Sequence, residues 1–292
     1  YRVEELLGKG GVGAVYRAVD AFSLRQVALK VILPEHRNNP ELRMRFVQEA
    51  RIGAQLSHPH IVSVLGGGEI RRSRGVREDT EAAIEIPTLD GQELLDGTLY
   101  VAFELLEGPS LREHLLAHGP LPYWEVPSAL GPLFEAVRYM HARGVVHRDL
   151  KPGNLHFGDT LKVLDLGSAK ANHEALVTFE GLESTTGNNA PMTWEYRSPE
   201  TFAGVPVVDP QVDLWALAGT VYRTVTGRVP FGGGSDLPSM VRRIMEGSFT
   251  PAREVDPSLP PAVDAFFSRA FALRVEDRFP SVEAMRDAAR EA

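Results

Sequence analysis

The sequence predicts an α+β protein with two lobes, a small strand-rich lobe followed by a larger and mostly helical one, with a cleft between them. In residues 1–105, short runs of β-prone residues alternate with glycines and polar turns. From Leu111 onward, apolar residues recur at helical spacing. The chain has 292 residues, of which 43% are hydrophobic, and chains of this length commonly divide into two lobes or domains.

The first lobe is predicted from two kinds of pattern. Clusters of β-branched and aromatic residues indicate strands over residues 3–7, 14–18, 26–32, 61–65 and 99–105. One amphipathic helix is expected over 41–56, since Leu42, Phe46, Ala50 and Gly53 lie at helical spacing. Pro59 follows shortly afterwards and favours a stop.

A charged segment interrupts this lobe at about residues 71–97. It opens with arginines and then becomes acidic. Two interpretations stay open, a docking or regulatory insert and a solvated surface loop with a short hairpin over 82–89. We favour the loop, because runs of charge usually face water.

The second lobe is predicted to be helical. The stretch 124–143 is amphipathic and is followed by Gly144, a residue that often ends a helix. Apolar periodicity predicts further helices over 211–226, 237–246, 262–271 and 281–291.

Composition excludes several classes of protein and of site. The net charge of −8 argues against a nucleic-acid binder, which would carry a basic face. With no cysteine, the chain has no disulfide, no zinc–cysteine site and no cysteine nucleophile. No apolar run is long enough to span a membrane, and there is no signal peptide. The chain lacks an initiator Met, so we expect a domain of a longer protein, located in the cytoplasm, with any membrane anchor outside this chain.

The first chemical motif is a glycine-rich turn, Gly8-Lys9-Gly10-Gly11-Val12-Gly13. Glycines let backbone N–H groups approach phosphate oxygens without obstruction by a Cβ. The same spacing opens dinucleotide-binding units, but there a helix follows. Here a strand follows, Val15-Tyr16-Arg17-Ala18.

The second motif is a lysine inside an apolar strand, Val27-Ala28-Leu29-Lys30. A buried ammonium is costly unless an anion meets it. Glu49 lies on the predicted helix at a position from which it could pair with Lys30 and orient the ammonium towards nucleotide phosphates. The alternative is a lysine that extends from an edge strand into water.

The third motif is the run His147-Arg148-Asp149-Leu150-Lys151-Pro152-Gly153-Asn154, followed shortly by Asp165-Leu166-Gly167. Two carboxylates, an amide and a lysine thus occur together in loops. These groups are what phosphoryl transfer needs, namely a base near the attacking hydroxyl, Mg²⁺ ligands and positive charge near the phosphate.

Together these motifs resemble, in order and over nearly the whole chain, the eukaryotic-type serine/threonine protein kinases, in a style typical of bacteria. Ser198-Pro199-Glu200 resembles the close of that family's activation segment. Asp213 resembles the aspartate that braces the catalytic loop, and Arg278 the arginine that pairs with Glu200.

The resemblance implies the bilobal protein-kinase fold with ATP in the cleft. The N-lobe would cover residues 1–105, with its insert at about 71–97, and the C-lobe residues 106–292, with an activation segment at 165–200. The implied activity is transfer of the ATP γ-phosphate to serine or threonine hydroxyls of protein substrates, with Mg²⁺, or Mn²⁺ as an alternative. Oligomeric state cannot be predicted.

The resemblance also assigns roles. Asp149 would accept the proton of the substrate hydroxyl, and Lys151 would neutralise charge on the γ-phosphate. Asn154 and Asp165 would ligate the metal. Thr193 lies where the family's serine/threonine kinases place a threonine that contacts the catalytic Asp and Lys.

For the adenine, the resemblance implies a pocket with side chains above and behind the base and backbone groups at its edge. Leu7, Val15 and Ala28 would lie above the base and Phe103 behind it. Backbone groups of Glu104 and Leu106 would bind its edge. His156 falls where the family has an apolar floor under the base. Alternatively, a shift in register places Leu155 or Phe157 there.

Regulation is implied by Arg148, which in the family often binds a phosphate on the activation segment. Autophosphorylation is therefore expected at one or more of Thr178, Ser184, Thr185 and Thr186.

Besides His156, three residues depart from the family pattern. Leu166 replaces the usual Phe of the metal motif, and it fills the same apolar place. Gly53 replaces a large apolar residue, which should loosen the contact of the helix with the metal loop. Met192 replaces a small Gly, which affects the expected binding of the peptide.

Two other functions compete with the active kinase, a scaffold on the same fold and a kinase of small molecules. A scaffold commonly lacks one of Lys30, Asp149, Asn154 and Asp165, and all four are present. Small-molecule kinases generally lack the Ser198-Pro199-Glu200 run, which is present as well.

Overall fold

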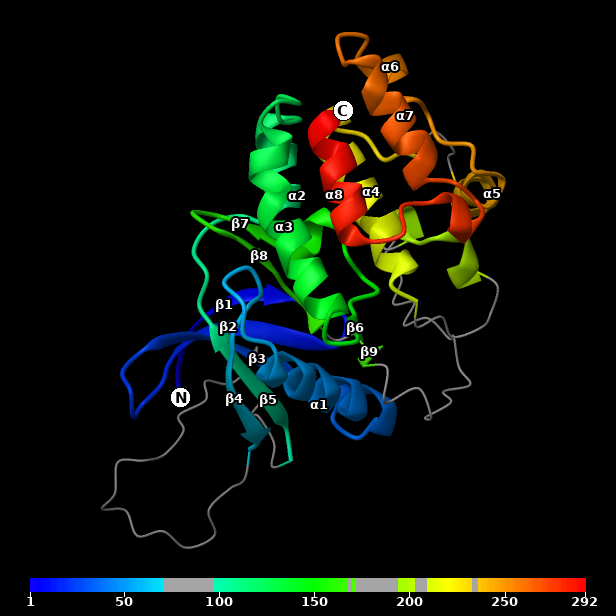
Figure 1. Ribbon diagram of the computed structural model, residues 1–292. Helices are drawn as coiled ribbons and strands as arrows, with labels where there is room; N and C mark the ends of the chain where they lie inside the picture. The colour runs from blue at the N-terminus through cyan, green and yellow to red at the C-terminus, as the bar shows by residue number, and fades with distance from the viewer. Residues whose placement is uncertain (71–96, 167–169, 172–193, 203–208, 233–235) are drawn as a thin grey trace, which may run out of the picture. The chain divides into compact units, whose positions relative to one another are not determined.

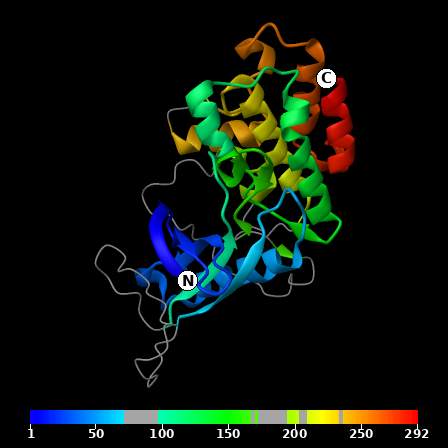
Figure 2. The ribbon, with the colours of Figure 1, turned by 90° about the vertical axis from the view of Figure 1, so that its left-hand side faces the viewer.

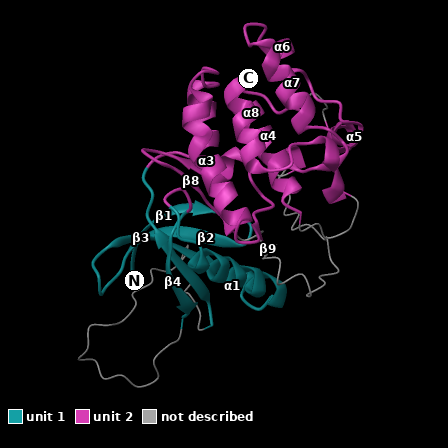
Figure 3. Cartoon of the chain, in the orientation of Figure 1, with its two compact units in different colours: residues 1–58, 62–107 teal, residues 59–61, 108–292 magenta. Residues whose placement is uncertain are grey.

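The computed structural model describes residues 1–70, 97–166, 170–171, 194–202, 209–232 and 236–292. They form two compact units (Figure 3). Unit 1 contains residues 1–58 and 62–107, and unit 2 contains residues 59–61 and 108–292. The predicted hairpin at 82–89, the phosphorylation candidates at 178–186, Met192 and Thr193 lie outside the described residues.

Unit 1 is an antiparallel sheet of five strands with one main helix (Figure 1). The strand order is β1-β2-β3-β5-β4. The elements are β1 (Arg2–Lys9), β2 (Gly13–Val19), β3 (Gln26–Ile32), the short 3₁₀ helix η1 (Pro34–His36), α1 (Pro40–Gln55), β4 (Val64–Glu69) and β5 (Leu99–Glu104). The start of α1 is capped because the Asn39 side chain accepts hydrogen bonds from the N–H groups of Glu41 and Leu42.

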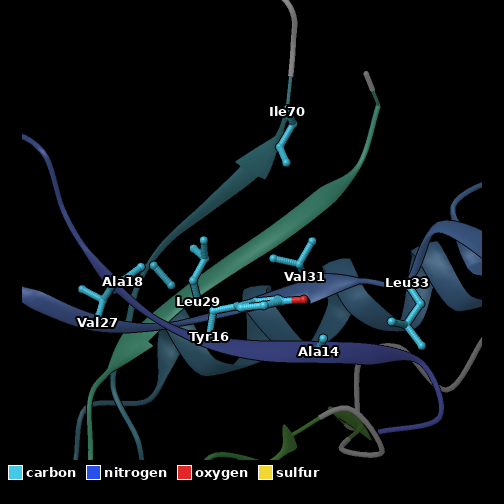
Figure 4. Packing of buried hydrophobic residues seen from close by; sticks show 9 residues of the cluster. Ala14, Tyr16, Ala18, Val27, Leu29, Val31, Leu33 and Ile70 are labelled. Carbon is cyan, nitrogen blue, oxygen red and sulfur yellow. The ribbon is translucent and has the colours of Figure 1, made fainter. Parts of the chain in front are cut away.

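One face of this sheet forms a hydrophobic cluster (Figure 4). Alternate residues of neighbouring strands contribute to it, since successive side chains of a strand point to opposite faces. Its buried members are Ala14, Tyr16, Ala18, Val27, Leu29, Val31, Leu33, Ile70 and Ala102. The residues between them, including Val15, Ala28 and Lys30, consequently lie on the opposite face.

Unit 2 is built around α4 (Gln211–Thr226), nearly all of which is buried. Its other helices are α2 (Leu111–His118), α3 (Val126–His141), α5 (Leu237–Glu246), α6 (Ala252–Val255), α7 (Pro261–Ala270) and α8 (Val282–Glu291). Helices α3 and α7 pack against α4, and α8 lies beside α3, as Figures 1 and 2 show.

Short strands carry the loops of unit 2. Strands β7 (Leu155–Phe157) and β8 (Leu161–Val163) form a hairpin, and β6 (Val145–Val146) pairs with β9 (Lys170–Ala171). The loop between β6 and β7 therefore begins and ends on paired strands. Short 3₁₀ helices lie at Pro152–Asn154, Trp194–Tyr196, Pro199–Phe202 and Val275–Asp277.

The α+β architecture predicted from the sequence is confirmed, with a strand-rich first unit and a helical second one. One strand starts later than expected. Ile61 forms a parallel bridge with Val163 of unit 2, and β4 begins only at Val64. Helices α2 and α6 were not among the predicted segments. Across the described residues, no helix has the length and apolar character needed to cross a membrane.

Candidate functional site

The lysine of β3 and the glutamate of α1 form a close ion pair. Lys30 Nζ lies 2.8 Å from Glu49 Oε1 and 2.7 Å from Oε2. The Glu49 side chain is 5% exposed and that of Lys30 is 20% exposed, so little water screens the pair. The sequence predicted this pairing, and the geometry agrees. The ammonium is thus held on the sheet face opposite the hydrophobic cluster.

The same face gathers other residues predicted to contact the nucleotide. In the strand register, Val15 lies opposite Lys30, and Ala28 lies opposite Phe103. Gly8 is the partner of Val15 on β1. These groups therefore form one continuous patch of unit 1.

Two parts of the predicted base pocket are less regular. Leu7 is exposed and lies where the register between β1 and β2 shifts. The N–H of Glu104 donates to the carbonyl of Ser63 at 3.0 Å. Of the two backbone groups of Glu104, the carbonyl is therefore the one predicted to bind the base. Leu106 follows β5 within unit 1.

The glycine-rich turn joins β1 and β2. The N–H of Gly10 donates to the carbonyl of Gly13 at 2.9 Å. A Cβ at Gly13 would lie 2.8 Å from the Val31 carbonyl oxygen, so packing requires glycine there. A Cβ at Gly8 or Gly11 would meet nothing within 4 Å, so the described neighbours do not require glycine at these positions.

In unit 2, the predicted catalytic residues contact one another. Lys151 Nζ lies 2.7 Å from Asp149 Oδ2. Asn154 Nδ2 donates to the same oxygen at 2.9 Å and to the Asp149 backbone carbonyl at 2.8 Å. The carboxylate is therefore fixed by two donors from its own loop.

A buried carboxylate braces this loop from behind. Asp213, on α4, is 0% exposed and accepts the N–H of His147 at 2.8 Å and that of Arg148 at 2.7 Å. His141 Nε2 lies 2.8 Å from its Oδ2. Arg148 has a φ of 69°, a costly conformation for a side chain that is not glycine. The hydrogen bonds that the His147 and Arg148 N–H groups donate to Asp213 hold the backbone in that conformation.

The predicted metal ligands Asn154 and Asp165 belong to neighbouring segments. The N–H of Leu164 donates to the Asn154 carbonyl at 2.8 Å, and His147 Nε2 lies 3.0 Å from the Leu164 carbonyl. Because the Asn154 side-chain nitrogen points to Asp149, its amide oxygen is left as a possible ligand. Asp165 has an exposed side chain and a φ of 55°.

This donor set suits a hard divalent cation. Mg²⁺ prefers oxygen ligands and is usually bound through one or two protein groups, waters and substrate phosphates. One carboxylate and one amide oxygen meet that requirement. In the part of the chain that the structure describes, no three His, Cys, Asp or Glu side chains gather into a site formed by protein alone.

An ion pair lies at the close of the predicted activation segment. Arg278 donates from Nη1 to Glu200 Oε1 at 2.9 Å and from Nη2 to Oε2 at 3.0 Å. The sequence predicted this pair as well. Burial alone would raise the pKa of the Glu200 carboxyl, but the hydrogen bonds and charge of Arg278 outweigh it and lower that pKa.

Sequence reasoning missed the residues just before this pair. The Arg197 guanidinium lies over the Trp194 ring, 4.5 Å from its centroid. Burial lowers the pKa of Arg197, and the negative charge of Asp149 opposes that shift. Burial also raises the pKa of the Glu195 carboxyl. The nearby Ser198-Pro199-Glu200 run marked this segment as important, but it gave no signal for these contacts.

The strand that holds His156 has a defined register. His156 is paired with Lys162, whereas Leu155 and Phe157 are paired with Val163 and Leu161. Since neighbours in a strand face opposite sides, His156 lies on the face away from Leu155 and Phe157. Phe157 packs against the ring of His114 of α2, with centroids 4.7 Å apart. His156 is thus separated from Leu155 and Phe157, which share the other face of the strand.

A pocket of about 250 Å³ lies elsewhere in unit 2. Side chains of α3, α4 and α7, with residues near Ala292, line it. It includes none of the residues predicted to bind a nucleotide or to act in catalysis.

The protein kinase domain model matches residues 1–288 of this chain. The serine/threonine-protein kinase PksC of Streptomyces coelicolor is 33% identical over 98% of this chain and 48% of its own length. The serine/threonine-protein kinase PknH of Mycobacterium tuberculosis is 30% identical over 100% of this chain and 42% of its own. The probable serine/threonine-protein kinase PknB of Bifidobacterium longum is 29% identical over 96% of this chain and 37% of its own length.

The chain thus spans less than half the length of these curated relatives. The family match covers both units and every motif discussed above. This chain belongs to the protein kinase domain family.

Proposed function

We propose that this chain is the catalytic domain of an active serine/threonine protein kinase, which transfers the γ-phosphate of ATP to serine or threonine hydroxyls of protein substrates. One observation carries the proposal. The Asp149 carboxylate is held by Lys151 and Asn154, and its loop is braced by Asp213. A scaffold has no need to fix a base in this way.

Unit 1 supplies the nucleotide contacts in this proposal. The glycine-rich turn from Gly8 to Gly13 covers the phosphates, and Lys30, oriented by Glu49, contacts two of them. The adenine lies against Val15, Ala28, Leu7 and Phe103, with His156 on the other side of the base.

Unit 2 supplies the chemistry. Asp149 accepts the proton of the substrate hydroxyl while the hydroxyl oxygen forms a bond to the γ-phosphorus. The bond between that phosphorus and the bridging oxygen of ADP breaks. Lys151 neutralises charge on the phosphoryl group in transit. A divalent cation, Mg²⁺ or in its place Mn²⁺, would be held by Asn154 and Asp165 and would neutralise charge on the phosphates.

The expected acceptors are hydroxyls of proteins, the chain itself included. Lys151 and Thr193 favour serine and threonine over tyrosine. Autophosphorylation is proposed among Thr178, Ser184, Thr185 and Thr186, where a phosphate could pair with Arg148. We place the domain in the cytoplasm, where ATP is available.

Incubation with radiolabelled Mg-ATP and a generic basic protein tests the proposal. We expect label on phosphoserine or phosphothreonine of that protein, and phosphopeptide mapping of the chain should find modified residues among the four candidates. Nucleotide binding without transfer would contradict the proposal and indicate a scaffold. Transfer only to a small molecule, or only to tyrosine, would contradict it as well.

A further inference from the structure

A single arginine of α1 ties that helix to two other parts of unit 1. Arg43 Nη1 donates to the carbonyl of Gly97 at 2.8 Å and to that of Arg37 at 3.2 Å. Its Nη2 lies 3.0 Å from Glu69 Oε1. The guanidinium group of arginine has several N–H donors in one plane, and here two of its nitrogens bind three acceptors at once. The single ammonium nitrogen of a lysine could not reach all three.

Two of these acceptors, Gly97 and Glu69, lie at the base of the charged insert, and the third, Arg37, lies just before α1. Glu69 ends β4, and Gly97 precedes β5. The chain is closed there, because the N–H of Ile70 donates to the Thr98 carbonyl and the N–H of Gly97 donates to the Ile70 carbonyl, both at 2.8 Å. We call Glu69, Ile70, Gly97 and Thr98 the neck. The neck is joined to the sheet, since Glu69 ends β4 and Ile70 belongs to the hydrophobic cluster.

Helix α1 needs such an anchor for its other task. It carries Glu49, which must stay within hydrogen-bond distance of Lys30. Further along, α1 presents Gly53 on its buried face, a residue with no side chain to hold the helix in place. Arg43 and Glu49 are about 9 Å apart along the axis at 1.5 Å per residue, within one rigid helix. A displacement of α1 at Arg43 is therefore transmitted to Glu49.

We propose that Arg43 is a positioning residue for nucleotide binding, which acts by fixing α1 to the neck and thereby keeps Glu49 on Lys30. The inference rests on the proposed function for the identity of the ligand. It goes beyond that function because the affinity for the phosphates would depend on the ion pair between Arg43 and Glu69, which lies at the base of the insert and does not include Lys30.

The test compares the affinities of ATP and adenosine by calorimetry, for the wild-type chain, Arg43→Ala, Glu69→Gln and Glu49→Gln. Adenosine has no phosphates, so its affinity should stay unchanged in all of them. ATP affinity should fall about three- to tenfold in Arg43→Ala, less in Glu69→Gln, and most in Glu49→Gln. Arg45→Ala, which changes an exposed arginine of the same helix, is the matched control and should bind ATP as the wild type does.

The double variant Arg43→Ala/Glu49→Gln decides how Arg43 acts. If it acts through Glu49, ATP affinity in the double variant should equal that of Glu49→Gln alone, within about twofold. An equal loss from Arg43→Ala in both backgrounds would overturn the proposal, and so would parallel losses for ATP and adenosine, which indicate general destabilisation. Because this readout is binding, it holds whether or not the wild-type chain transfers phosphate, so a failure of the proposed activity is seen separately.

Discussion

Replacing Arg278 by methionine should destabilise unit 2 strongly. The arginine side chain is 1% exposed and makes four hydrogen bonds. Two go to Glu200, one to the Ala272 carbonyl at 2.7 Å and one to the Leu273 carbonyl at 3.2 Å. Its guanidinium also lies 4.8 Å from the centroid of the Trp215 ring. Methionine keeps most of the apolar stem but none of the donors.

The size of the effect follows from what is left behind. Removing one partner of a buried ion pair costs about 3–5 kcal/mol, because the other charge stays without compensation. The Glu200 side chain is 22% exposed, so water can rehydrate part of it and the lower end of that range is expected. At roughly 2–4 °C per kcal/mol for a unit of this size, the melting temperature should fall by about 6–12 °C.

Thermal unfolding followed by circular dichroism measures this, with Arg274→Met as control. The Arg274 side chain is 71% exposed and pairs with Glu276 on the surface, so its loss should cost no more than about 1 kcal/mol. Glu200→Gln combined with Arg278→Met should recover part of the loss, since no charge is then left unpaired. Equal melting temperatures for the two methionine variants would refute the reasoning.

Three further predictions concern pH and the nucleotide. The pKa of Glu200 is lowered below 4.5 in the folded chain, so its ion pair stabilises unit 2 above that pH. This contribution is lost as the pH falls through the folded pKa. Melting curves at about pH 3–6 should show the loss of this ion-pair contribution in the wild type but not in Arg278→Met. Lys30→Met should weaken ATP but not adenosine and reduce transfer by about a hundredfold or more, as measured by calorimetry and label incorporation; wild-type turnover would contradict the role of the Lys30–Glu49 pair. Adenosine does not itself titrate between about pH 5.5 and 8, so its affinity, measured by calorimetry, should vary with pH in the wild type and be flat in His156→Leu; a flat wild-type profile would remove a titrating imidazole from the base pocket.

Much of the candidate site was predictable because its residue types are dictated by chemistry. A lysine in an apolar strand needs an anion as its partner, and helical spacing on α1 indicated Glu49 as that anion. The resemblance supplied Glu200 with Arg278, and Asp213 behind the catalytic loop, and each contact is present. Bounds of the long helices were within a few residues of the observed ones.

Some local signals were present but unused. Helix α2 starts with a capping box, in which Ser110 and Glu113 exchange hydrogen bonds, and this spacing is readable from sequence. Other features come from tertiary contacts alone. Strand β4 starts late because Ile61 pairs with Val163, far along the chain. Two acceptors of Arg43, Gly97 and Glu69, likewise come from segments distant in the sequence.

The central claim is that Asp149 is the base of a phosphotransfer site. The most direct measurement compares Asp149→Asn with the wild type for ATP affinity and for label transferred to a basic protein. Asparagine preserves the shape but cannot accept the proton, so transfer should fall by at least about a hundredfold while ATP affinity stays within about threefold. Transfer at a rate near that of the wild type would contradict the account.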